Sequence, residues 1–128
     1  MNNQEKILEY NFLLKHLQQL QQNTQAVHNH LEELKNIQEN FTQLATTPPG
    51  TETLIPLGSG LFFKGKTESA DNILINVGAN ILVEKTIPQA METIQKQFSE
   101  IEQLLSQLEE EAGKLTEQLE NVRREMKE

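Results

Sequence analysis

Apolar residues recur at alternating steps of three and four positions through the first third of the chain. Two polar residues interrupt the series, which runs Tyr10, Leu13, Leu17, Leu20, Thr24, Val27, Leu31, Leu34, Gln38, Phe41 and Ala45. A seven-residue period of this kind predicts an α-helix that carries a coiled-coil seam along one face. We expect this helix within residues 1–46.

The last third of the chain repeats the pattern without interruption. Its seam positions are Ile87, Met91, Ile94, Phe98, Ile101, Leu105, Leu108, Ala112, Leu115, Leu119, Val122 and Met126. Thr86 is the predicted N-cap, with Pro88 in the first turn and Gln89 completing a capping box. We therefore expect a second helix over residues 87–128. Because the two helices have nearly equal lengths, they are predicted to form an antiparallel coiled-coil hairpin.

The segment between the helices, residues 51–86, lacks the heptad pattern and has a different residue pattern. Pro48-Pro49-Gly50 ends the first helix, because proline lacks an N–H and its ring clashes with the preceding turn. Four short β-rich runs follow: Thr53–Leu57, Leu61–Thr67, Ile73–Val77 and Ile81–Lys85. The turns Gly58-Ser59-Gly60 and Gly78-Ala79-Asn80 separate them in pairs, which predicts two β-hairpins.

These hairpins are apolar on both faces. Phe62 and Phe63 are adjacent in one strand and must point to opposite sides, as must Ile81 and Leu82. Short strands also leave open edges that other chains can pair with. The α+β chain is therefore expected to oligomerise through this segment. The residues predicted to make the contact are Leu57, Leu61, Phe62, Phe63, Ile73, Ile75, Val77, Ile81 and Val83.

Composition narrows the possible functions. The chain has 128 residues, a net charge of −8 and a pI near 4.9, which disfavours nucleic acid and anionic membrane surfaces as partners. The lack of cysteine excludes disulfides and thiol catalysis. The sequence contains no basic leader with an apolar core and no run approaching the roughly 20 apolar residues of a membrane span. We expect a single cytoplasmic domain over residues 1–128.

One stretch matches a catalytic motif by its letters alone. Residues 60–67 read GLFFKGKT, which fits the phosphate-binding pattern G-x-x-x-x-G-K-[ST]. That motif requires a tight loop that opens into a helix, whereas this stretch is predicted to be a strand followed by a turn. No nucleotide or other cofactor is therefore expected.

The histidines and the glutamate run also do not indicate a metal-binding or catalytic site. His28 and His30 lie two positions apart, about 200° around a helix axis, so they cannot hold one metal ion. Glu109, Glu110 and Glu111 are splayed by 100° steps in the same way. We interpret both groups as solvated helix surface, with no metal site and no enzymatic activity.

Apolar residues close to the two chain ends allow two interpretations. Ile7, Leu8, Leu119, Val122 and Met126 can belong to an ordinary seam. Alternatively, they form an exposed and adaptable surface at the end of the helix pair that binds many apolar partners.

The stretches LIPLGSGLFFKGK and NILINVGANILVEKT, flanked by heptads, resemble the archaeal alpha subunit of prefoldin. The resemblance covers nearly the whole chain. It implies a heterohexamer of two alpha and four beta subunits, whose hairpins build a double β-barrel platform bearing six coiled coils. It further implies a chaperone whose coiled-coil tips hold non-native proteins without ATP and transfer them to a group II chaperonin. A structural or adaptor coiled coil that binds no client is the alternative.

Overall fold

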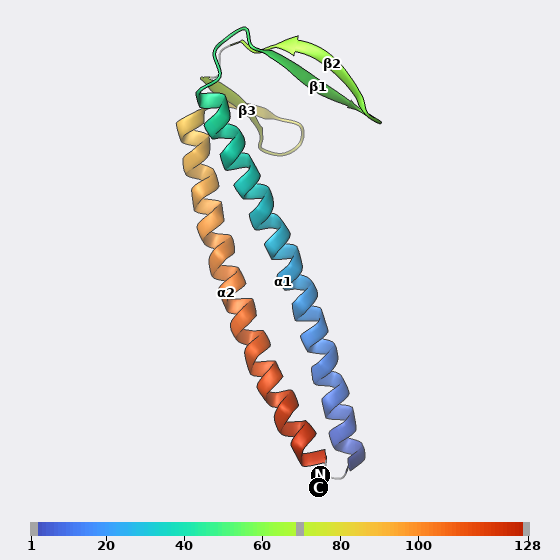
Figure 1. The fold of residues 1–128 in the computed structure, drawn as a ribbon. Helices are drawn as coiled ribbons and strands as arrows, with labels where there is room; N and C mark the ends of the chain where they lie inside the picture. The colour runs from blue at the N-terminus through green and yellow to red at the C-terminus, as the bar shows by residue number, and fades with distance from the viewer. Residues whose placement is uncertain (1–2, 69–70, 127–128) are drawn as a thin grey trace. The chain divides into compact units, whose positions relative to one another are not determined.

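The computed structural model describes residues 3–68 and 71–126 and contains two long helices with two strand pairs between them (Figure 1). The elements are α1 (Asn3–Ala45), β1 (Glu52–Gly58), β2 (Leu61–Lys66), β3 (Asn72–Asn76), β4 (Leu82–Thr86) and α2 (Ile87–Met126). The predicted order of two helices around two hairpins is confirmed. The chain divides into two compact units, a helical unit (Met1–Glu33 with Phe98–Glu128) and a mixed unit (Leu34–Gln97).

Within the helical unit, α1 and α2 run antiparallel. Lys6 Nζ lies 3.6 Å from Glu125 Oε2, so the beginning of α1 is beside the end of α2. All predicted seam positions of α2 in this unit are buried or half-buried. Leu20, Leu115, Leu119 and Val122 are the buried apolar side chains in the described part of the unit. The heptad pattern therefore identified the contact face correctly.

In the mixed unit, the start of α2 shows the predicted capping box. The backbone N–H of Thr86 donates to Gln89 Oε1 at 3.2 Å, and the backbone N–H of Gln89 donates to Thr86 Oγ1 at 3.3 Å. These two bonds satisfy N–H groups that a helix start leaves without intrahelical partners. The side chains therefore define where α2 begins.

At the end of α1 one seam position was predicted wrongly. Ala45 is exposed, whereas Leu44 is half-buried. Leu44 lies three residues after Phe41, so it shares the half-buried face of that residue.

Each strand pair forms its own antiparallel two-stranded sheet. In the first sheet Ile55 lies opposite Phe63, and in the second Ile75 lies opposite Val83. The second hairpin gains one more pairing outside the assigned strands, because the Val77 N–H donates to the Ile81 carbonyl at 3.0 Å. Strand ends differ from the predicted ones by one residue or so, which is the usual uncertainty of element boundaries.

Candidate functional site

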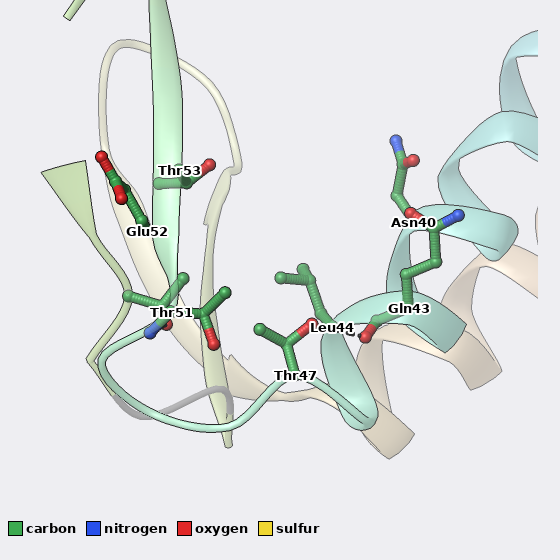
Figure 2. Close-up of a pocket in the computed structure, with 8 residues that line it drawn as sticks. Asn40, Gln43, Leu44, Thr47, Thr51, Glu52 and Thr53 are labelled. Atoms are coloured by element: carbon green, nitrogen blue, oxygen red, sulfur yellow. Dashed lines mark hydrogen bonds between the residues drawn. The ribbon is translucent and has the colours of Figure 1, made fainter. Parts of the chain in front are cut away.

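A polar depression lies between the end of α1 and the first hairpin (Figure 2). Two of its threonines hydrogen-bond to the backbone: Thr51 Oγ1 donates to the Pro48 carbonyl at 2.6 Å, and Thr67 Oγ1 donates to the same oxygen at 3.2 Å. The Gly50 N–H donates to the Thr67 carbonyl at 2.7 Å. This network joins the base of the hairpin to the loop after α1. We interpret the depression as a structural feature that holds the hairpin to this loop, and not as a binding site.

The first hairpin exposes apolar side chains on both faces. Cross-strand partners share a face, so Ile55 and Phe63 lie on one side of the sheet, and Pro56 and Phe62 lie on the other. The predicted contact residues Leu57, Leu61, Phe62 and Phe63 are all exposed, and so are Leu54 and Ile55, which the sequence prediction omitted. Within the described residues, both faces of this sheet are therefore left open to solvent.

In the second hairpin the two faces differ in how far their side chains are exposed. Ile73 and Ile75 are half-buried and line an apolar groove together with Ile37, Phe41 and Ile94 of the chain's own helices. Towards the turn, the predicted residues Val77, Ile81 and Val83 are exposed.

The opposite face of the second hairpin carries Leu74 and Leu82, both exposed and both missed by the sequence prediction. Ile73 and Ile75 therefore stabilise the mixed unit itself, and their role in oligomerisation stays a prediction. Alternation alone could have indicated Leu74, since it lies between two apolar residues of the opposite face.

The end of the helical unit favours the seam interpretation for two of the residues on α2. Leu119 and Val122 are only 8% and 6% exposed because they pack into the seam. Met126 is half-buried. The part of Leu119, Val122 and Met126 in client binding stays a prediction.

The exposed apolar surface at this end belongs to α1. Leu8 is 69% exposed and Ile7 is 47% exposed, which agrees with the interpretation of an exposed surface for these two residues. Phe12, which the sequence prediction did not name, is 71% exposed and lies one helical turn after Leu8. We call Ile7, Leu8 and Phe12 the α1 end patch. The signal that could have found Phe12 is its place outside the heptad series, between Tyr10 and Leu13.

The GLFFKGKT stretch is a strand, as predicted. Leu61–Lys66 forms β2, and the next helix begins at Ile87. Its lysines project from a sheet that is exposed to solvent, and Lys66 lies opposite Glu52. The segment lacks the strand–loop–helix geometry that cradles a phosphate.

The histidines and the glutamate run lie on exposed surface of the helical unit. His16 Nε2 is 3.9 Å from Glu111 Oε1, and His28 Nε2 is 4.0 Å from Glu109 Oε1. Over residues 3–68 and 71–126, no three His, Cys, Asp or Glu side chains gather closely enough to hold a metal ion. Neither helix, as far as the structure describes it, has an apolar stretch of the length needed to cross a membrane.

The sequence as a whole matches a known family. The family model described as "Prefoldin subunit" matches residues 13–128. The chain belongs to the prefoldin family.

Several archaeal prefoldin alpha subunits are similar to this chain. The subunit of Thermofilum pendens is 24% identical over 114 residues, which cover 89% of this chain and 88% of the relative. That of Pyrococcus horikoshii is 28% identical over 125 residues, covering 98% of this chain and 77% of the relative. "Prefoldin subunit alpha 2" of Thermococcus kodakarensis is 38% identical over 77 residues, covering 57% and 54%.

Two solved prefoldin structures share the fold. Filamentous prefoldin from Methanocaldococcus jannaschii has a TM-score of 0.74 at 21% identity, covering 95% of this chain and 98% of that one. The prefoldin beta subunit from Thermococcus strain KS-1 has a TM-score of 0.63 at 18% identity, covering 97% and 88%. Prefoldin membership makes this chain a chaperone subunit, with an exposed apolar end patch and two exposed hairpins as its candidate surfaces.

Proposed function

We propose that the chain is an ATP-independent holdase subunit that binds unfolded proteins at the end of its coiled coil. The α1 end patch is the observation that carries this proposal, because Leu8 and Phe12 are large apolar side chains left more than two-thirds exposed. Such side chains bind the apolar segments that an unfolded client presents. Lys6, the residue before Ile7, lies 3.6 Å from Glu125 and so joins this end of α1 to α2.

In this mechanism an unfolded client first contacts the α1 end patch. Leu119 and Val122 remain in the seam, so a client contacts them only where the helix ends separate. Each single patch binds weakly, and several patches on one assembly hold one client by avidity. Nucleotide has no part in this cycle, in keeping with the strand geometry of Leu61–Lys66.

The assembly in this proposal is a cytoplasmic heterohexamer of two such alpha chains and four prefoldin beta subunits. The exposed hairpins, with Phe62 and Phe63 on opposite faces, support a β-barrel platform as the contact. Bound clients pass to a group II chaperonin when the chaperonin competes for their apolar segments.

Replacing the patch tests client binding. The double variant Leu8→Gln/Phe12→Gln, assembled with a beta subunit, should suppress aggregation of a chemically denatured protein at least several-fold less well. Its helix content and unfolding midpoint should stay near the wild-type values, because exposed substitutions change stability by about 0.5 kcal/mol or less.

Leu104→Gln is the matched control. Leu104 is an exposed leucine of α2 outside the patch, and its change should leave aggregation suppression unaltered. If the patch variant protects the denatured protein as well as the wild type does, client binding at this end is wrong. Binding of one folded protein at fixed stoichiometry, with no affinity for unfolded chains, would instead support a structural or adaptor role.

A further inference from the structure

The apolar end patch of α1 is followed by a polar but uncharged stretch of the same helix. Residues 16–31 contain no lysine, arginine, aspartate or glutamate, although 23% of the whole chain is charged. Exposed amide side chains take the place of charges there. Those that face away from the seam, which we call the α1 amide face, are Gln18, Gln19, Gln22, Asn23, Gln25 and Asn29. Loss of charged residues is typical of the centre of an interface.

The α1 amide face lies on the same side of the helix as the α1 end patch. Eleven residues make about three turns, so residues with this spacing lie within about 20° of one another around the axis. The amides that follow the three patch residues at this spacing are Gln18, Gln19 and Asn23. From Ile7 to Asn29 the surface is about 33 Å long, which matches roughly ten residues of extended chain. An unfolded segment held on the patch therefore reaches the amide face.

Two hydrogen bonds hold amides of this face in place. Gln19 Nε2 donates to Asn23 Oδ1 at 3.2 Å, and Gln25 Nε2 donates to Asn29 Oδ1 at 3.0 Å. Each bond uses one N–H of the glutamine and one lone pair of the asparagine, so these amides keep further donors and acceptors. An extended backbone presents the same donors and acceptors at every residue. The amide face can therefore hydrogen-bond an unfolded backbone independently of its sequence.

The neighbouring surface of α2 is acidic. Residues 100–117 contain six glutamates and one lysine. His16 Nε2 lies 3.9 Å from Glu111 Oε1, and His28 Nε2 lies 4.0 Å from Glu109 Oε1. The uncharged stretch of α1 and the acidic stretch of α2 are therefore side by side in the helical unit. A segment with acidic side chains is repelled at this place, whereas a neutral or basic segment is not.

We propose that the α1 amide face is a second part of the client site and binds the extended backbone of an unfolded segment whose apolar residues occupy the α1 end patch. It rests on the client binding proposed above. The patch holds the segment close to the amides, which raises the effective concentration of its peptide groups there. The segments accepted in this way carry no acidic side chains next to their apolar residues.

A peptide probe tests the amide face in the purified full-length chain. The probe joins an apolar block to a flank of serine and glycine, has about ten residues to span the whole surface, and is labelled with fluorescein. The variant Gln19→Ala/Gln22→Ala/Gln25→Ala should weaken its binding about threefold or more in fluorescence anisotropy, since each hydrogen bond contributes modestly. Helix content should not fall, because alanine is the better helix former.

Amides of α2 provide the matched control. The variant Gln103→Ala/Gln107→Ala/Gln118→Ala makes the same three changes at exposed positions outside the amide face and should leave the affinity for the probe unaltered. A probe without its flank should bind the wild type and the amide variant equally well, because it does not reach the amides.

The charge of the flank gives a second readout. A flank of aspartate and glutamate should weaken binding to the wild type several-fold at low salt and less at about 0.5 M salt, where exposed charges are screened. The variant Glu109→Gln/Glu110→Gln/Glu111→Gln should recover part of that loss. The control Glu39→Gln/Glu52→Gln/Glu84→Gln makes the same change in net charge in the mixed unit and should recover less.

Three results overturn the proposal: an amide variant that binds the long probe as tightly as the wild type, an acidic flank that binds as tightly as the neutral one, and equal recovery by the two glutamate variants. Client binding at the patch is judged separately by Leu8→Gln/Phe12→Gln. If that variant loses affinity while the amide variant does not, the patch remains the client site and the amide face is no part of it. If neither loses affinity, both proposals fail.

Discussion

At the scale of single residues, the leucines of the two helices are far from equivalent. Leu34 is 3% exposed in the mixed unit, whereas Leu104 of the helical unit is 41% exposed. The free energy that a leucine contributes depends on how much of its apolar surface leaves water and on how well its surroundings pack. Stability should therefore be concentrated at a few positions along each helix.

Truncating one of these leucines tests that distribution. Leu34→Ala should lower the free energy of unfolding by about 2–4 kcal/mol, because it leaves a cavity in the packed face. Leu104→Ala is the control and should cost less than about 1 kcal/mol. Both are measured by urea unfolding followed by circular dichroism at one fixed protein concentration, since association shifts apparent stability. Equal losses at the two positions would contradict the burial pattern.

At the scale of elements, two glycines have opposite effects on stability. Gly78 has a φ of 118° in the turn between β3 and β4, a conformation that side chains disfavour. Gly113 lies within α2, and a Cβ added there would meet no atom within 4 Å. The first glycine makes its hairpin possible, while the second weakens its helix.

The same substitution should therefore have opposite effects at the two sites. Gly78→Ala is expected to destabilise the chain by about 1–3 kcal/mol through backbone strain. Gly113→Ala should stabilise it by about 0.5–1 kcal/mol through helix propensity. Thermal unfolding by circular dichroism gives both signs, and a shift in the same direction for both variants would refute this interpretation of the turn.

At the scale of the whole molecule, the mixed unit leaves apolar sheet surface uncovered. Phe62 and Phe63 are both exposed, although they point to opposite faces of one strand. Aromatic side chains bury large areas and dominate the energy of cores and interfaces. Residues 3–68 and 71–126 cover neither side chain, which favours further subunits as the covering layer.

Mixing the chain with an archaeal prefoldin beta subunit tests this assembly. We expect a species with the mass of six chains, two of this chain and four of the beta subunit, by light scattering and native mass spectrometry. Phe63→Gln should reduce the yield of that species strongly, since it places an amide in the interface. Phe12→Gln is the matched change in the α1 end patch and should leave the mass unchanged. A complex that forms equally well with both variants would exclude the hairpin as the contact.

The helices and hairpins could be predicted from the sequence, because their signals are local. Heptad spacing identified the buried face of α2 from Phe98 to Met126, and Thr86 with Gln89 marked where that helix begins. The glycine turns likewise placed both hairpins within a residue or so of their observed ends. Each of these features follows from interactions among residues that are neighbours along the chain.

Which apolar side chains remain exposed could not be predicted from the sequence and follows from the packing of the folded chain. Leu119 and Val122 are covered by the opposing helix, while Phe12 is not, although all three are large or branched apolar residues near a chain end. In the second hairpin Ile75 is half-buried in the groove of its own unit, whereas its neighbour Leu74 is 65% exposed. Exposure depends on what lies across from a side chain, and that partner comes from a distant part of the sequence, which periodicity does not specify.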